Sequence, residues 1–122
     1  MSRLQEIQFE LMEMSSFNSF DGKFTVEQLK AHPEWWTGAM WGRFEYSPLI
    51  PLRDMDNDNS WNADTLYIMV NPAFKAEMVK LMHDCGADEI DFESVERMSS
   101  LMGSYGPGDK KAESNLLRVW WD

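Results

Sequence analysis

The chain has 122 residues, of which 43% are hydrophobic, a composition that suits one folded domain and argues against intrinsic disorder. Its 21 acidic residues outnumber its 11 basic residues and give a net charge of −10. A surface this negative repels nucleic-acid phosphates and anionic lipids, so we expect neither a nucleic acid nor a membrane as a partner. Such a surface is compatible with basic protein partners, with cations, or with solubility alone, which is the commonest reason for it.

Cellular compartment is suggested only by what the sequence lacks. Cys85 is the single cysteine, so an internal disulfide is excluded and nothing points to an oxidising environment. The first ten residues carry several charges and lack the apolar core of a secretory signal. No run approaches the roughly 20 apolar residues that span a bilayer. We therefore expect a soluble cytoplasmic protein.

An apolar stripe predicts an amphipathic helix over residues 3–14. Its members recur at spacings of three and four residues, and we expect them to be buried: Leu4, Ile7, Leu11 and Met14. Residues 15–22 follow as a linking loop, whose two phenylalanines we expect to point inward.

Two further helices are predicted before residue 43. The first begins at the capping-box pair Thr25 and Gln28 and ends near His32. It ends there because Pro33 disfavours the α conformation in the residue before it. Pro33 then suits the first turn of the next helix, which Gly42 ends. The buried side of that helix should carry Trp35, Trp36, Ala39 and Met40.

The clearest strand signal comes from residues 65–70, T-L-Y-I-M-V, which should be covered on both faces. A helix follows, with Asn71 as its cap, Pro72 at its first position and Gly86 at its end. Its buried face should carry Phe74, Met78, Leu81, Met82 and Cys85. Alternation of apolar and acidic residues then predicts a half-exposed strand over residues 88–93.

A short helix closed by Gly103 and a strand over residues 116–121 complete the chain. Because residues 65–93 run strand, helix, strand, we expect a parallel pair with a right-handed crossover, to which the terminal strand adds antiparallel. The predicted fold is one α+β domain spanning residues 1–122. It has a small mixed sheet of about three or four strands with a β-α-β unit, and the N-terminal helices pack over it.

Residues 54–64, D-M-D-N-D-N-S-W-N-A-D, form the stretch richest in candidate ligands. Aspartates at every second position can turn their carboxylates toward one hard cation. The candidate Ca²⁺ or Mg²⁺ ligands are Asp54, Asp56, Asp58 and Asp64. The EF-hand pattern fails here, since Asn59 replaces its glycine and Thr65 its bidentate glutamate. The same composition is typical of a metal-free turn, so both interpretations stay open.

Catalytic motifs are weak throughout the chain. The D-x-D pattern follows P-L-I-P-L-R instead of the apolar strand that a phosphatase site needs. The glycine-rich residues 103–110 lack the G-K-[ST] ending of a phosphate-binding loop. Cys85 falls on the apolar face of its helix and points away from His83, so we expect an inert, buried thiol. We therefore expect no catalytic activity and no cofactor besides the candidate cation.

Six tryptophans are unusual in a chain of this length, and we expect at least one to stay exposed as an anchor for a protein partner. Trp61 is the leading candidate because it lies within the acidic stretch. Trp120 and Trp121 are neighbours on a strand and point to opposite faces, so one should be buried while the other faces outward. The acidic residues expected to surround these anchors are Asp88, Glu89, Asp91 and Glu93. Protection of a strand edge against sheet-to-sheet pairing also explains these acids.

The sequence thus predicts a small, acidic, cytoplasmic module that binds another protein without catalysis. An inhibitor or immunity-type protein that complements a basic nucleic-acid enzyme is one form of this hypothesis. The alternative is a divalent-cation-dependent ligand-binding or hydrolytic site on residues 54–64. A homo-oligomer is compatible with both.

Overall fold

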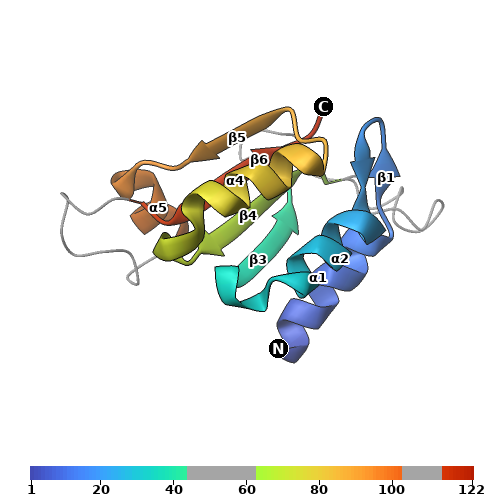
Figure 1. The fold of residues 1–122 in the computed structure, drawn as a ribbon, viewed down its shortest axis with the longest axis horizontal. Coiled ribbons are helices and arrows are strands. Elements are labelled where there is room, and N and C mark those ends of the chain that lie inside the picture. Colours follow the sequence, from blue (N-terminus) through green and yellow to red (C-terminus); the bar gives the residue numbers. More distant parts are fainter. Residues whose placement is uncertain (44–62, 103–113) are drawn as a thin grey trace.

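The computed structural model of the chain describes residues 1–43, 63–102 and 114–122. Within these ranges the chain forms a four-stranded sheet, a two-stranded hairpin and four α-helices (Figure 1). The predicted α+β class is therefore confirmed. None of the described helices is both long enough and apolar enough to cross a membrane.

The main sheet has the strand order β3-β4-β6-β5. These strands are β3 (Trp36–Gly42), β4 (Thr65–Val70), β6 (Leu116–Trp120) and β5 (Glu89–Phe92). All three neighbouring pairs are antiparallel. Consequently β4 and β5 run parallel to each other but do not pair, and the predicted direct parallel pair within a mixed sheet is wrong. The terminal strand β6 lies between them because it hydrogen-bonds on both sides, in the antiparallel geometry that is slightly more stable per residue.

Residues 36–42 form strand β3 instead of the predicted helix, after a single 3-10 turn, η1 (Pro33–Trp35). The register shifts between Trp36 and Gly38, as in a β-bulge, so the buried residues of the strand are Trp36, Ala39 and Trp41. Their spacings of three and then two residues resemble the period of a helix. The bulge therefore explains why the pattern of apolar residues favoured the wrong element.

Helix α1 (Arg3–Glu13) forms where predicted but buries a different face. Phe9 and Met12 are in the core, whereas Leu4 is 77% exposed and Met14 is also exposed. The helix packs against the edge strand β3, to which it hydrogen-bonds through Gln5 and Gln8, neither of which belongs to the apolar stripe. The predicted burial of the stripe is thus wrong for most of its members.

Helix α2 (Gly22–Ala31) begins one turn earlier than predicted and ends at the predicted position. Its N-cap is Asp21, whose carboxylate accepts a hydrogen bond from the first turn. Thr25 lies inside the helix and donates its hydroxyl to the Asp21 carbonyl, so the predicted capping box does not form. Position 22 requires glycine, because a Cβ there would lie 1.7 Å from the carbonyl oxygen of Met12.

The segment between α1 and α2 is a small hairpin, β1 (Ser16–Phe17) and β2 (Phe20–Asp21), where a loop was predicted. Phe20 points inward, as expected of the phenylalanines here. Its ring centroid lies 4.5 Å from that of Trp41 and 4.7 Å from that of Trp121. The hairpin therefore closes one end of the core with an aromatic cluster.

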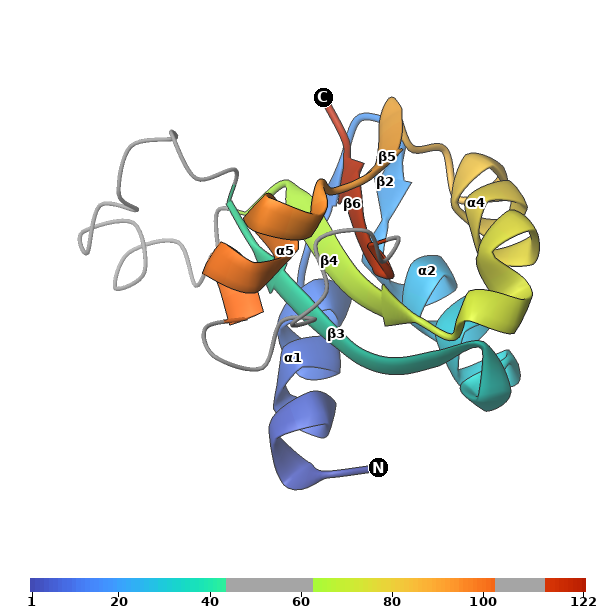
Figure 2. The same ribbon diagram turned by 90° about the vertical axis from the view of Figure 1, so that its left-hand side faces the viewer.

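Helices α4 (Lys75–Asp84) and α5 (Val95–Met102) confirm two further predictions. A 3-10 turn, η2 (Pro72–Phe74), precedes α4. Asn71 caps this turn, since its side chain accepts a hydrogen bond from the Ala73 N–H, in the capping role expected of it. Figure 2 shows that α2 and α4 lie on one face of the sheet and α5 on the other. We call the face covered by α2 and α4 the inner face, and the face covered by α5 the outer face. The inner face is the main core and includes Leu66, Ile68, Val70, Met78, Met82, Leu117 and Val119.

Two glutamines of α1 close the outward edge of β3. The Gln5 side-chain amide accepts a hydrogen bond from the Ala39 N–H and donates one to the Ala39 carbonyl, each at 2.8 Å. Gln8 accepts a hydrogen bond from the Trp41 N–H, also at 2.8 Å. These amides take the place of a neighbouring strand, and an edge so covered does not pair with another chain.

Replacing Gln5 with alanine should lower the free energy of unfolding by about 1–2 kcal/mol, because two backbone groups of β3 lose their partners. Urea unfolding followed by tryptophan fluorescence measures this change. The matched control is Glu27→Ala, at an exposed position of α2. Equal stability of the two variants would show that the amide does not hold the edge.

Candidate functional site

The candidate site lies on the outer face of the main sheet, which carries an open groove and a group of charged side chains. In an antiparallel sheet, residues that face each other across strands form rows of adjacent side chains. From β3 to β5, the middle row reads Met40, Tyr67, Arg118 and Asp91. The row on one side reads Gly38, Met69, Leu116 and Glu93. The row on the other side reads Gly42, Thr65, Trp120 and Glu89. The outer face is therefore apolar near β3 and charged along β5.

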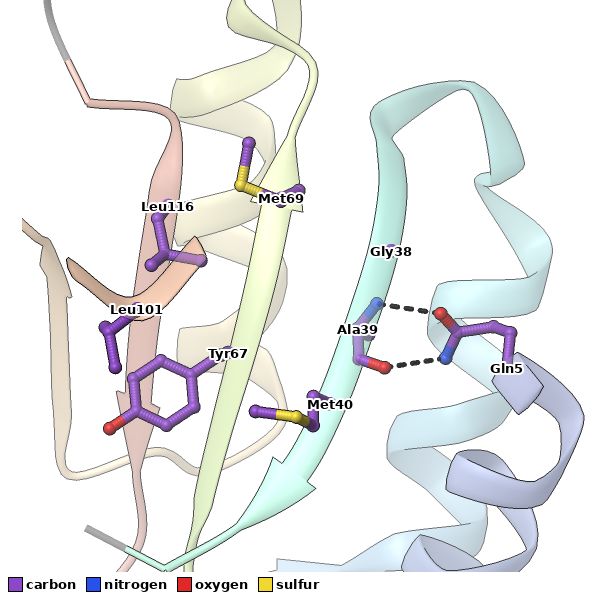
Figure 3. Close-up of a pocket in the computed structure, with 8 residues that line it drawn as sticks. All are labelled: Gln5, Gly38, Ala39, Met40, Tyr67, Met69, Leu101 and Leu116. Atoms are coloured by element: carbon purple, nitrogen blue, oxygen red, sulfur yellow. Dashed lines mark hydrogen bonds between the residues drawn. The ribbon is translucent and has the colours of Figure 1, made fainter. Parts of the chain in front are cut away.

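An open groove of about 280 Å³ lies over the apolar part of this face. Figure 3 shows the side chains that line it, from α1, β3, β4, α5 and β6. Tyr67 and Leu116 are buried and pack with Met98 of α5. Met40 is 54% exposed and Leu101 is 40% exposed. Methionine side chains adapt to irregular apolar shapes, so a groove bordered by them can accept a partner's side chain.

Arg118 is surrounded by three carboxylates, two from the edge strand β5 and one from the residue that follows it. Its guanidinium lies 3.3 Å from Glu89, 3.2 Å from Asp91 and 3.2 Å from Glu93. The arginine side chain is only 15% exposed, whereas those of Glu89 and Asp91 are 55% and 66% exposed. One positive charge is set against three negative charges, so the group keeps a negative surplus that faces solvent. Spacing along the chain does not reveal this pairing, because Arg118 lies 25 or more residues from the three acids.

Trp120 is the only one of the two terminal tryptophans that belongs to the outer face. It is half-buried, and its indole N–H donates to the Asp64 carboxylate at 3.2 Å. Trp121 is fully buried on the inner side and donates its indole N–H to the carbonyl of Cys85 at 3.1 Å. The two side chains thus diverge as predicted, and the folded chain does not offer Trp121 to a partner.

Asp64 has a structural role at the start of β4. One of its carboxylate oxygens accepts a hydrogen bond from the Thr65 hydroxyl at 2.8 Å, and the other accepts the one from Trp120. Its backbone carbonyl also accepts a hydrogen bond from the Trp121 N–H. A cation bound by this carboxylate would have to compete with both side-chain hydrogen bonds.

The other residues proposed for the acidic stretch lie outside the described part of the chain: Asp54, Asp56, Asp58 and Trp61. The candidate cation site therefore stays a prediction. Over residues 1–43, 63–102 and 114–122, no three His, Cys, Asp or Glu side chains are placed to hold a metal ion. Asp88, predicted to border a partner site, accepts a hydrogen bond from the backbone N–H of Asp122 at 2.8 Å.

Cys85 is buried at the end of α4, as predicted. Burial raises the pKa of its thiol from 9.0 to about 11, while a hydrogen bond with Thr25 acts in the opposite direction. The thiol is therefore protonated near neutral pH. A protonated, buried thiol is a poor nucleophile, which agrees with an inert role.

This raised pKa predicts a loss of stability in alkaline solution. Between pH 9 and about pH 11 the unfolded thiol releases its proton while the folded thiol keeps it, so the free energy of unfolding should fall as pH rises. Below pH 9 the contribution should be constant. Urea unfolding at a series of pH values measures the effect against Cys85→Ala, which lacks this thiol. Parallel pH profiles for the two proteins would contradict it.

Replacing Arg118 with methionine should destabilise the fold by about 1–3 kcal/mol, because the largely buried Glu93 carboxylate loses its guanidinium partner. Adding Glu93→Gln to this variant should recover part of the loss. Lys23→Met, at an exposed position of α2, is the control for removing one surface cation. Thermal unfolding of the unmodified chain and the three variants measures these changes in stability. Equal stability of Arg118→Met and the Lys23→Met control would disprove a stabilising role for Arg118.

Similarity to known proteins gives no guide to this surface. Neither the protein-family models, nor the curated proteins, nor the solved structures contain a match to the chain.

Proposed function

We propose that the chain is a protein-binding module whose outer face contacts the partner. The observation that carries the proposal is the apolar groove with its exposed Met40 and Leu101, which shares one sheet face with exposed carboxylates. Apolar contact area beside charged groups is the usual arrangement of a binding surface, with an apolar centre and a polar rim.

The size of the groove favours a single anchoring side chain over a small-molecule ligand. Its volume of about 280 Å³ is at or below the lower limit of roughly 300–1,000 Å³ for small-molecule pockets, and it is open to solvent. An apolar side chain from a partner can cover Tyr67 and Leu116 between the two exposed residues. Such anchors contribute most of the binding energy in many interfaces.

Charge narrows the class of partner. Glu89 and Asp91 hold exposed carboxylates on the same face as the groove, and the whole chain carries a charge of −10. A partner with lysine or arginine beside its apolar anchor associates faster and is selected over acidic competitors. Trp120 lies next to Glu89 across the sheet and offers a part-buried aromatic contact at this end. An inhibitor-type protein that masks a basic enzyme in the cytoplasm is one form of this function.

Selection from a randomised peptide library displayed on phage tests the proposal without a known partner. The folded chain should enrich peptides with one large apolar residue flanked by lysine or arginine. Met40→Asp and Leu101→Asp should each weaken the selected peptides by about tenfold or more, because a carboxylate in the groove removes the apolar contact.

The matched control is Leu4→Asp, which alters an equally apolar and more exposed residue on α1. It should leave binding unchanged. If the selected peptides still bind both groove variants but no longer bind Leu4→Asp, then the binding surface is on α1, and the proposal is contradicted. A library that yields no specific peptide would contradict it too.

A further inference from the structure

The two edges of the main sheet are treated differently by the fold. The edge at β3 is covered by α1, whose glutamine amides bond to its backbone. The edge at β5 is the last strand of the sheet, and Figure 1 shows no described element beside it on that side. An uncovered strand edge is a template for pairing with another chain.

The register shows which backbone groups of β5 face outward. Glu93 donates its N–H to the carbonyl of Leu116 on β6. Backbone groups of alternate residues point to the same side of an antiparallel strand, so Glu89 and Asp91 also face β6. The N–H and C=O groups of Ile90 and Phe92 therefore point away from the sheet. Two donors and two acceptors line this edge.

We infer that β5 is a docking edge for an extended, basic segment of a partner protein, which adds to the sheet as a fifth, antiparallel strand. Every neighbouring pair in the described sheet is antiparallel, which sets the direction. Main-chain hydrogen bonds to Ile90 and Phe92 supply the attachment, as in known cases of strand addition. This edge shares the carboxylates of Glu89 and Asp91 with the surface around the groove, but its main-chain attachment does not depend on the apolar groove.

Charge complementarity identifies the side chains that the segment must carry. Residues of the added strand that lie on the outer face come beside Glu89 and Asp91, whose carboxylates are more than half exposed. Each carboxylate contacts Arg118 through one oxygen and keeps acceptor capacity for a second cation. Lysine or arginine at alternate positions of the added strand would supply the second cation to these carboxylates. The intervening positions lie on the side of Ile90 and Phe92, which are half-buried and pack against the core, so they should be apolar.

A second copy of the chain is a poorer occupant of the same edge. Pairing two β5 strands would place Glu89, Asp91 and Glu93 of one copy beside the same three acids of the other. Like charges that face each other across strands are destabilising, and charged edge residues are a recognised protection against self-association. The acids thus exclude a copy of the chain while attracting a basic segment.

The test uses a capped six-residue peptide in which lysine and valine alternate, titrated into the isotope-labelled chain and followed by NMR. We expect saturable binding that weakens with added salt and slower hydrogen exchange at the amides of Ile90 and Phe92. Two methylated peptides are the matched pair. N-methylation of the valines removes the donors that face β5 and should weaken binding at least about tenfold, while N-methylation of the lysines should not.

Variants of the chain test the charge argument. Glu89→Gln combined with Asp91→Asn should weaken the peptide about threefold to tenfold and reduce the dependence on salt. The control, Glu27→Gln combined with Glu34→Gln, removes two exposed acids elsewhere and should retain most of the affinity. Met40→Asp should leave this peptide unaffected, which separates failure of the edge from failure of the groove.

Three results would overturn the inference. The first is no binding at millimolar peptide. The second is binding that leaves the exchange of Ile90 and Phe92 unchanged, or that tolerates methylated valines as well as methylated lysines. The third is a dimer of the chain in sedimentation, with these two amides already protected, since a second copy would then be the occupant.

Discussion

The insertion of β6 between β4 and β5 is the constraint on which the rest of the structure depends. Both neighbours hydrogen-bond to this one strand, so without it the sheet separates into β3-β4 and a lone β5. Its side chains also serve both faces: Leu117 and Val119 complete the inner core, while Leu116 and Arg118 build the outer face. The proposed binding surface and the core therefore both depend on the side chains of β6. Because these pairings join residues distant in sequence, their loop-closure entropy is lost before the contacts that stabilise them are made.

Local sequence patterns predicted an element correctly where its burial is regular, on both faces of a strand or on one face of a helix. The strand at 65–70 is covered on both faces and reads as a continuous apolar run, and helix α4 has one buried face between clear end signals. The errors have a common physical origin in features of pairing that are not local. A bulge in β3 displaced its inward residues to a spacing that resembles a helix. Helix α1 meets the edge of a strand through Gln5 and Gln8, so polar residues face its neighbour and the apolar stripe does not decide its orientation.

The same distinction holds for the candidate site. The alternation of acids along 88–93 and the divergence of Trp120 and Trp121 follow from the period of a strand, so both were predictable. The inner face of the sheet is the one that α2 and α4 cover. The spacing of residues in the sequence does not show which face these helices cover. Arg118 was missed for a related reason. It becomes a partner of Glu89, Asp91 and Glu93 only through the register of β6 against β5. The groove was missed as well, since Met40 and Tyr67 become neighbours only across the β3–β4 pair.

The imbalance between one arginine and three carboxylates explains how a single edge can be both stable and selective. Full neutralisation would remove the repulsion that keeps two β5 edges apart, and complete absence of the arginine would leave Glu93 largely buried without a cation. With one guanidinium, the least exposed carboxylate is satisfied while the two most exposed ones retain a surplus of negative charge. Selectivity of this kind combines attraction for one class of partner with repulsion of another. In the docking role that we infer for β5, the acidic residues of this edge determine which strands can be added to the sheet.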